Sequence, residues 1–323
     1  MYNFKKAAFE NGVFMRYILK FFFFKIWPKI PYHTKLISVA ARKFSAGKSV
    51  SGALILGQKL NAEGFHCQFN YAGDHIDSPE SRDRAIEIYG KLIEEIKNQK
   101  VWAGISVKLG QMGLFSQNLY RAKTRSKFFA LVEKAYEAGV PLWIDEEEDK
   151  YKDKTNEILS AISDKHSVGN VLQAYLRKIF EKVNKRLQFK NKPIFRICKG
   201  AYTESCGVTL RHISSIRILY KTLVMSLLQK GYYLQIATHD KKLINLVVEM
   251  DRAGLISRNN FEFAMLYGVD MELARQLLKK GYKVVIYVIF GEDKDIEGYV
   301  IRRIIEKPKY LFLPVQALFR AFS

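Results

Sequence analysis

Short β-rich, mostly apolar runs recur along the sequence, and each is followed by a stretch with the character of a helix. There are eight runs: Phe65–Tyr71, Val101–Leu109, Pro141–Asp145, Asn170–Tyr175, Pro193–Lys199, Tyr233–His239, Phe261–Leu266 and Lys283–Ile289. Several lack polar alternation, which is typical of parallel strands that are covered on both faces. Eight β–α units across residues 65–306 predict an α/β fold, a TIM-like (βα)8 barrel, which usually takes roughly 250 residues.

A doubly wound parallel sheet is the alternative, because it also alternates strands with helices. No GxGxxG follows any of the runs, and neither a Walker loop nor HExxH occurs. Nothing therefore indicates a Rossmann nucleotide site. Ser78, Pro79 and Glu80 predict the start of a long helix that continues to about Asn98.

The chain is strongly basic, with 53 Lys and Arg against 32 Asp and Glu and a formal charge of +21. Such an excess suits lipid headgroups or nucleic acid, although it also arises where Lys simply fills solvated positions. The cysteines Cys67, Cys198 and Cys206 form no CxxC and are odd in number. We therefore expect a reducing compartment, no disulfide framework and no bound metal.

The first 44 residues carry nine Lys or Arg and a single acid, Glu10. Within them, the apolar stretch Tyr17–Trp27 is interrupted by Lys20 and Lys25, and no run of 18 apolar residues predicts a spanning helix. The segment is either an interfacial amphipathic arm or a helical arm packed on its own domain. We expect an N-terminal helical arm over 1–58, the barrel over 59–310 and a C-terminal tail over 311–323.

Polar residues stand at the carboxyl ends of the predicted strands, where barrel enzymes place their catalytic groups. They include Lys108, Asp145, Gln173, Arg196, Lys199, Thr238, His239 and Tyr287. A single charged strand end is usually a solvated edge, but six such ends in one barrel require partners or a ligand. Lys108 and Asp145, on neighbouring strands, are expected to pair.

Four residues of the last predicted helix share one face, because Tyr299, Arg302, Arg303 and Glu306 are spaced at i, i+3, i+4 and i+7. Taken alone, this stripe fits a solvated outer face. Two adjacent arginines, however, repel each other and gain most from a shared anion, and the planar guanidinium suits a carboxylate. A small carboxylate substrate at the barrel mouth is therefore the alternative to a solvated face, and the helix alone leaves both open.

Five segments in order resemble the proline dehydrogenase family, over about residues 60–307. They are Ile105–Leu109, Arg196–Tyr202, Ile236–His239, Phe261–Gly268 and Tyr299–Glu306. The resemblance implies a distorted (βα)8 barrel that binds FAD noncovalently and has its last helix over the barrel mouth. It further implies oxidation of L-proline to Δ1-pyrroline-5-carboxylate, the first step of proline catabolism, with electrons passed to a membrane quinone.

The resemblance also implies a role for each matched residue. Arg302, Arg303 and Lys108 would hold the proline carboxylate, and Asp145 would pair with Lys108 and the arginines. Arg196 would lie beside the flavin N5. The substrate ring would be enclosed by Ala201, Tyr202, Leu266, Tyr287 and Tyr299. The remaining FAD contacts would come from Gln173, Lys199, Gly200, Thr238, His239 and Glu306.

Some matched positions depart from the family pattern, which usually has Gln at Ala264, Pro at Ile289, Asn at Asp240, Asn at Lys307 and an aliphatic residue at Cys198. Asp240 and Lys307 are expected to alter the surroundings of the cofactor. Tyr287 favours proline as the substrate, because relatives that prefer hydroxyproline have a smaller residue there.

Two rival functions remain open at this stage. One is a catalytically inactive barrel that binds an anionic membrane or nucleic acid, although the retained site residues argue against it. The other is a flavin dehydrogenase of another cyclic or N-alkyl amino acid. We expect a cytoplasmic proline dehydrogenase, peripheral on the inner face of the membrane, that does not bind nucleic acid. The short chain predicts a separate pyrroline-5-carboxylate dehydrogenase as its partner.

Overall fold

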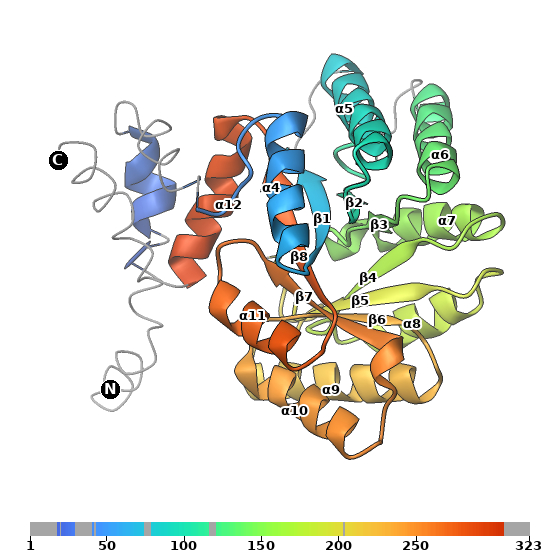
Figure 1. Cartoon of the computed structure of the whole chain (residues 1–323), viewed down its shortest axis with the longest axis vertical. Coiled ribbons are helices and arrows are strands. Elements are labelled where there is room, and N and C mark those ends of the chain that lie inside the picture. Colours follow the sequence, from blue (N-terminus) through green and yellow to red (C-terminus); the bar gives the residue numbers. More distant parts are fainter. Residues whose placement is uncertain are drawn as a thin grey trace.

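Eight parallel strands close into a barrel in which each strand pairs with the next in sequence and β8 pairs with β1 (Figure 1). The strands are β1 (His66–Tyr71), β2 (Ala103–Val107), β3 (Leu142–Ile144), β4 (Gly169–Gln173), β5 (Ile194–Cys198), β6 (Leu234–Ala237), β7 (Phe261–Leu266) and β8 (Val284–Phe290). Six of the eight predicted runs contain a strand completely, and the other two overlap β4 and β8, which each extend one residue beyond the run. The (βα)8 barrel predicted from the recurring apolar runs is therefore confirmed, and the doubly wound sheet is excluded.

The computed structural model describes residues 18–19, 21–29, 41, 43–73, 79–115, 121–202 and 204–306, apart from the side chains of Phe24, Pro28, Pro79, Arg121, Ala122, Arg302 and Glu306. The helices are α4 (Val50–Ala62), α5 (Pro79–Asn98), α6 (Arg121–Glu137), α7 (Lys152–Ser163), α8 (Ile179–Leu187), α9 (Ile213–Gln229), α10 (Lys241–Arg252), α11 (Met271–Lys279) and α12 (Asp293–Glu306). Short helical turns occur at Phe22–Ile26, Trp27–Lys29, Asp149–Tyr151 and Arg258–Asn260. Among the described residues, no helix has the length and apolar character needed to cross a bilayer.

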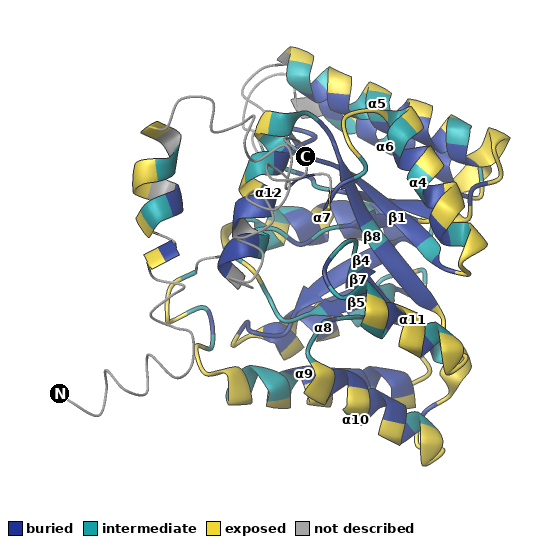
Figure 2. Ribbon diagram, turned by 60° about the vertical axis from the view of Figure 1, so that its left-hand side comes forward, coloured by how far each residue is buried: buried dark blue, intermediate teal, exposed yellow. Residues whose placement is uncertain are grey.

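The strands are buried on both faces, which explains their apolar sequences. Figure 2 shows the strands almost wholly buried, with the surrounding helices buried toward the barrel and exposed on the outside. The helices α5 to α11 alternate with the strands in sequence, as the pattern of the chain predicts. The helix that opens at Pro79 ends at Asn98, as predicted.

Helix α4 precedes the first strand and packs against both β1 and β8. Ser49 caps its start, since the hydroxyl accepts a hydrogen bond from the backbone N–H of Gly52 at 3.1 Å. A Cβ at Gly57 would lie 2.7 Å from the Phe69 ring, so the helix and β1 approach closely there. In a regular barrel the helix after β8 would cover this outer position, so α4 excludes α12 from it. The predicted boundary between residues 58 and 59 falls inside α4.

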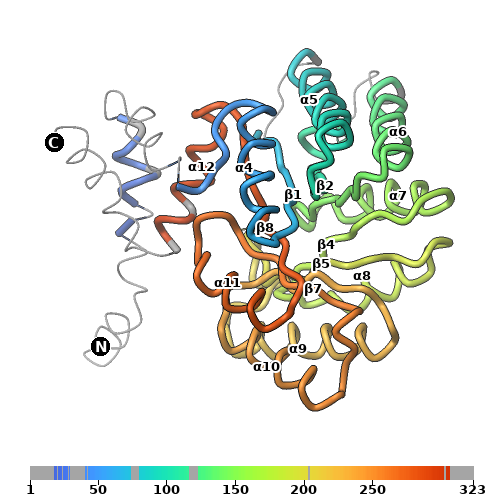
Figure 3. Tube along the Cα trace, in the orientation of Figure 1, coloured from blue at the N-terminus to red at the C-terminus, as the bar shows by residue number. Residues whose placement is uncertain are grey.

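Helix α12 instead buries an apolar side in a cluster of its own. The cluster includes Val300, Ile301, Ile304 and Ile305 of the helix, Ile289 of β8, and Leu19, Phe23 and Phe44 from the N-terminal part of the chain. The Trp27 indole N–H also donates to Glu297 at 2.7 Å. Figure 3 shows residues 18–29 beside α12. This contact agrees with the arm that packs on its own domain, at least for residues 18–29.

Candidate active site at the carboxyl ends of the strands

A cavity of about 650 Å³ lies at the carboxyl ends of the strands and beneath α12. The predicted site residues that line it are Lys108, Asp145, Gln173, Arg196, Lys199, Gly200, Ala201, Tyr202, Thr238, His239, Leu266, Tyr287, Tyr299 and Arg303. Two further predicted residues, Arg302 and Glu306, belong to α12, and their side chains lie outside the described part of the structure. Folding therefore gathers groups from β2 to α12 around one space, within the range of about 300–1,000 Å³ typical of ligand sites.

The carboxylate of Asp145 is the centre of the polar contacts at the cavity floor. Its Oδ1 accepts hydrogen bonds from the Ser106 hydroxyl at 2.7 Å and from Arg196 Nη1 at 3.0 Å. Its Oδ2 accepts a hydrogen bond from the Tyr287 hydroxyl at 2.7 Å. Three strands, β2, β5 and β8, thus send donors to one carboxylate that follows β3. The predicted pairing of Asp145 with Lys108 stays a prediction.

Tyr287 is held as a hydrogen-bond donor by its surroundings. Burial raises the pKa of Tyr287 well above its ordinary value of 10, and the negative charge of Asp145 raises it further. The hydroxyl therefore keeps its proton at neutral pH. The Arg196 guanidinium lies 5.3 Å from the centre of the Tyr287 ring and 4.6 Å from the Trp143 ring, both within range of a cation–π contact.

Helix α12 contributes Arg303 and Tyr299 to the lining of the same cavity. The Arg303 guanidinium lies 5.1 Å from the centre of the Tyr299 ring. Lys108 follows β2 directly and lines the same space. Cationic groups from two elements therefore line a cavity that also has aromatic walls, a combination suited to a small carboxylate with an apolar body.

The side of the cavity formed by β4, β5 and β6 supplies amide, imidazole and backbone groups. The Gln173 amide nitrogen donates to the carbonyls of Glu146 and Glu147 at 3.0 and 3.2 Å, which sets the orientation of that side chain. His239 Nε2 accepts from the backbone N–H of Leu266 at 3.2 Å, so its ring proton belongs on Nδ1.

Gly200 has a φ of +112°, and a Cβ there would lie 2.2 Å from the Tyr175 ring. Only glycine allows the chain to turn here beside the cavity. Among the described residues no group of three or more His, Cys, Asp or Glu could hold a metal ion. The groups on this side are suited to an organic cofactor, whose planar rings and hydroxyls need such contacts.

The departures from the family pattern have identifiable surroundings where the structure describes them. Asp240 caps α10 through the N–H of Lys242, and its carboxylate lies 2.8 Å from Arg217 and 3.5 Å from Lys199. An acid at this position thus neutralises two cations at the cavity edge. Burial raises the pKa of the Cys198 thiol to about 12, so this cysteine is not a nucleophile. Ala264 lines the cavity, Ile289 packs with α12, and Lys307 lies outside the described residues.

A buried ion cluster supports the loop that carries Asp145. Glu146 accepts hydrogen bonds from Lys182 at 2.8 Å and from Arg186 at 2.5 Å. Arg186 is fully buried and also donates to the Val171 carbonyl and to the Asn156 side chain. Helix α8 is therefore fastened to the segment after β3, next to the cavity.

Sequence reasoning missed several polar residues inside the barrel. Arg196 Nε donates to Gln235 at 2.7 Å, Arg196 Nη2 donates to Gln68, and Gln235 in turn donates to Glu262 at 2.8 Å. The available signal was a polar residue within an otherwise apolar strand. Burying such a residue without a hydrogen-bond partner costs free energy, so a partner is expected. The prediction concerned strand ends alone, so these mid-strand positions were overlooked.

The fold and the cavity together define a (βα)8-barrel protein with its site at the carboxyl ends of the strands. A model of the family "Proline dehydrogenase" matches residues 54–309. Proline dehydrogenase 1 of Bacillus subtilis subsp. natto is 31% identical over 279 residues, which are 86% of this chain and 89% of that protein. The proline dehydrogenase of Deinococcus radiodurans is 30% identical over 285 residues, 87% of this chain and 90% of its own length.

A solved structure agrees in fold. Proline utilization A from Bdellovibrio bacteriovorus, inactivated by N-propargylglycine, matches with a TM-score of 0.75 at 21% identity, over 83% of this chain and 32% of that one. This chain thus corresponds to about a third of that protein. The chain belongs to the proline dehydrogenase family, and proline is the substrate that the family name implies.

Proposed function

We propose that the protein oxidises L-proline to Δ1-pyrroline-5-carboxylate, with FAD as its cofactor and a membrane quinone as the electron acceptor. The observation that carries the proposal is that Arg196 and Tyr287 both donate to Asp145 in a cavity that Arg303 also lines. Membership of the proline dehydrogenase family supports the same assignment.

Substrate binding is assigned to the cations and aromatic walls of the cavity. Arg302, Arg303 and Lys108 would hold the carboxylate, and each charge-assisted hydrogen bond would contribute about 1.5–3 kcal/mol. The ring of proline would lie among Ala201, Tyr202, Leu266, Tyr287 and Tyr299. Tyr287 is held by its hydrogen bond to Asp145. Tyr299 faces the guanidinium of Arg303. Arg303 would thus both bind the carboxylate and face one of the walls.

The chain itself contributes orientation more than acid–base chemistry. A carboxylate held at one end and a ring enclosed by aromatic side chains leave one carbon next to the nitrogen directed toward the cofactor side. The cationic surroundings also disfavour a protonated amine, and loss of hydride from that carbon requires the neutral amine. Asp145, hydrogen-bonded to Ser106, Arg196 and Tyr287, would keep these groups in place during turnover.

FAD fits the residues on the β4–β6 side of the cavity. Gln173, Arg196, Lys199, Gly200, Thr238 and His239 would hold it there, and Glu306, at the end of α12, would add a contact. The close approach at Gly200 and the Nδ1 proton of His239 favour a planar ring system with hydrogen-bonding substituents. When bound, FAD would supply the two-electron acceptor that no amino-acid side chain provides. Arg196 would lie where negative charge develops on the reduced cofactor.

Association with an anionic membrane surface completes the proposal, which places the enzyme on the inner face of the membrane. The formal charge of +21 favours such a surface. Ile18, Phe21 and Ile26 are exposed, and Lys25 and Lys29 lie beside them. Exposed aromatic and aliphatic side chains next to lysines suit the boundary between headgroups and acyl chains.

The test is purification followed by assay. We expect yellow protein that reduces a dye acceptor with proline and does so less well with 4-hydroxyproline or sarcosine. Colourless protein that takes up no added FAD would refute the cofactor. Faster turnover of sarcosine or hydroxyproline would refute the substrate.

A substitution at the carboxylate site gives a sharper test. Arg303→Met should raise the KM for proline by at least about 10-fold, because it removes a charge-assisted hydrogen bond. The bound FAD, measured by its visible absorption, should remain. Arg275→Met is the matched control, since Arg275 pairs with Glu63 on the outside of the barrel. Loss of both proline affinity and FAD in Arg303→Met would mean that the binding site for the proline carboxylate has been assigned to the wrong residue.

A further inference from the structure

A row of buried polar side chains crosses three neighbouring strands inside the barrel. Arg196, Gln235 and Glu262 are partners in the register of β5, β6 and β7. Arg196 Nε donates to Gln235 Oε1 at 2.7 Å, and Gln235 Nε2 donates to Glu262 Oε1 at 2.8 Å. All three residues are buried. The row therefore joins the cavity floor to the interior below it.

The orientation of the Gln235 amide follows from its two neighbours. An ionised carboxylate only accepts hydrogen bonds, and a guanidinium only donates them. With Glu262 ionised, the amide nitrogen of Gln235 must face the glutamate, and its oxygen must face Arg196. Removal of the carboxylate would leave the amide nitrogen with only the long contact to Gln68 Oε1, at 3.5 Å. The orientation of the amide oxygen toward Arg196 would then be held less firmly.

A second glutamine, Gln68, also has its amide orientation set by its neighbours, with the oxygen toward Arg196. Gln68 Nε2 donates to the Ile105 carbonyl at 2.8 Å, and its oxygen accepts from Arg196 Nη2. Arg196 Nη1 then reaches Ser106 and Asp145 at 3.1 and 3.0 Å. The guanidinium is thus clamped by acceptors whose own orientations are set by groups farther from the cavity.

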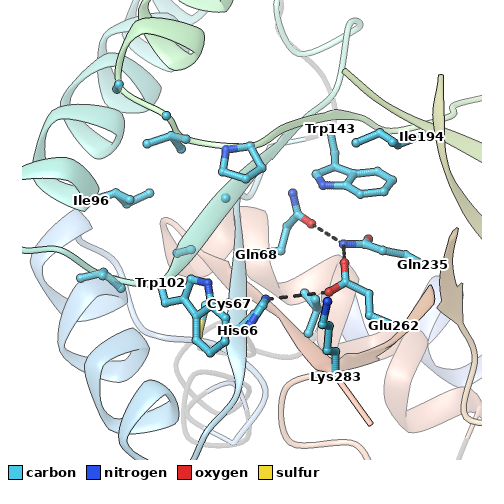
Figure 4. Close-up of a pocket in the computed structure, with 18 of the residues that line it drawn as sticks. His66, Cys67, Gln68, Ile96, Trp102, Trp143, Ile194, Gln235, Glu262 and Lys283 are labelled. Carbon is cyan, nitrogen blue, oxygen red and sulfur yellow. Dashed lines mark hydrogen bonds and ion pairs between the residues drawn. The ribbon is translucent and has the colours of Figure 1, made fainter. Parts of the chain in front are cut away.

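The lower end of the row opens into a second pocket, of about 700 Å³, at the amino-terminal ends of the strands. Figure 4 shows Glu262 between Gln235 and His66, with Lys283 and the two tryptophans Trp102 and Trp143 around the pocket. His66 Nδ1 lies 3.8 Å from the carboxylate, and Tyr233 is also hydrogen-bonded to it. Burial raises the pKa of Glu262 above its ordinary value, while Gln235 and Tyr233 counteract this.

The row does not conduct protons, because the guanidinium of Arg196 cannot release one at accessible pH. Its contribution is electrostatic and geometric. Arg196 lies between Asp145 at the cavity and the carboxylate of Glu262 behind Gln235, so the guanidinium is oriented from both ends.

We propose that Glu262 is a positioning residue for proline oxidation, which acts through Gln235 to hold Arg196 in place beside Asp145 and the cofactor. This inference rests on the proposed function, because Arg196 is assigned there to the cofactor side. Glu262 itself contacts neither substrate nor cofactor. Its effect should therefore fall on turnover and on the cofactor potential, and not on the binding of proline.

The test uses the FAD-loaded full chain and three variants. Glu262→Leu should lower kcat by about 10- to 100-fold, the range for residues that orient an active-site group. The KM for proline should stay within about threefold, FAD should remain bound, and the redox potential of the bound FAD should fall. The kcat of Glu262→Gln should lie between those of the wild type and Glu262→Leu, because the new amide oxygen can still accept a hydrogen bond from Gln235. Glu249→Leu, on the exposed side of α10, is the matched control.

The double variant Gln235→Glu with Glu262→Gln tests the chain of contacts. Glutamate at 235 accepts from Arg196, and glutamine at 262 donates to that glutamate. The double variant should therefore keep most of the kcat that Glu262→Leu loses. A merely structural role predicts no such recovery. The inference is overturned if Glu262→Leu leaves kcat and potential unchanged, or if it lowers stability, FAD content and proline affinity together.

A readout that needs no turnover, made on the full chain as purified, separates this inference from the proposed function. With arginine labelled by ¹⁵N, the Nε–H proton of Arg196 should exchange slowly in the wild type, rapidly in Glu262→Leu and slowly again in the double variant. Equal exchange in all three would overturn the positioning of Arg196. The expected exchange pattern in a protein that does not oxidise proline would instead overturn only the proposed function.

Discussion

At the scale of single residues, the site depends on which atoms can donate and which can accept. Asp145 accepts from Ser106, Arg196 and Tyr287, so one carboxylate aligns three strands. The raised pKa of Tyr287 keeps it a donor to that carboxylate. The same reasoning assigns the orientation of Gln235 and the ring proton of His239. A small number of forced donor and acceptor roles thus defines the geometry of the cavity floor.

Tyr287→Phe should remove one donor from Asp145 and leave the aromatic wall in place. A hydrogen bond to a charged group contributes about 1.5–3 kcal/mol, so kcat/KM for proline should fall by roughly 10- to 100-fold. Steady-state kinetics with a dye acceptor measure the effect. Tyr136→Phe, at an exposed position on α6, is the control. An unchanged kcat/KM in Tyr287→Phe would contradict the assigned role.

At the scale of elements, two contacts position the site. Helix α4 covers the outside of β1 and β8, so α12 lies at the cavity instead. The apolar side of α12 packs against residues 18–29. On the other side, Glu146 joins the segment after β3 to α8 through Lys182 and Arg186. Both contacts link segments that are distant in sequence, and each supports a residue that lines the cavity.

Loss of the Glu146 charge should destabilise the protein strongly. Glu146→Gln leaves the buried Arg186 without its counterion and leaves Lys182 with only Asp149, at 3.7 Å. Breaking a buried ion pair costs about 3–5 kcal/mol in comparable cases. Urea unfolding should show this loss of stability. Glu181→Gln, at an exposed position of the helix α8 that carries Lys182 and Arg186, should change the stability little. Wild-type stability in Glu146→Gln would show that the cluster is not structural.

The same cluster predicts a pH dependence. Burial alone would raise the pKa of Glu146, but Arg186 and Lys182 outweigh it and hold the pKa below the ordinary 4.5. The unfolded chain then binds a proton more readily than the folded one, so this stabilisation is present above pH 4.5 and is lost as the pH falls through the folded pKa. Wild-type stability should fall more steeply than that of Glu146→Gln in this range.

At the scale of the whole molecule, the charge of +21 and the exposed apolar residues of the N-terminal part predict an electrostatic affinity for anionic membranes. Ile18, Phe21 and Ile26 are exposed on a segment that also packs against α12. The arm can therefore contact its own barrel on one side and a surface on the other. The two alternatives drawn from the sequence are compatible in this structure.

Binding to anionic liposomes should weaken as salt rises, because the Debye length falls from about 10 Å at 0.1 M to about 3 Å at 1 M. Sedimentation with vesicles measures this. If residues 18–29 face the membrane, Lys25→Glu with Lys29→Glu should reduce binding more than the control Lys279→Glu with Lys280→Glu, at the C-terminal end of α11. Equal binding to neutral vesicles at every salt concentration would refute the electrostatic part.

The sequence by itself determined the barrel and the residues at its mouth. Eight buried apolar runs leave few architectures, and polar groups such as Lys108 and Asp145 at strand ends must meet at one edge because parallel strands share it. The position of α12 could not be read from its periodicity, since a polar stripe with Arg303 suits solvent as well as a cavity. That preference came from family resemblance.

Tertiary structure alone decided how these residues are held. The row of Arg196, Gln235 and Glu262 depends on the register of three strands, and the anchoring of Asp145 depends on β2, β5 and β8 meeting at one carboxylate. Such contacts join positions up to 142 residues apart, as Tyr287 and Asp145 are. Local sequence patterns indicate which segments are buried strands, but only barrel closure brings these strands together and pairs their polar atoms.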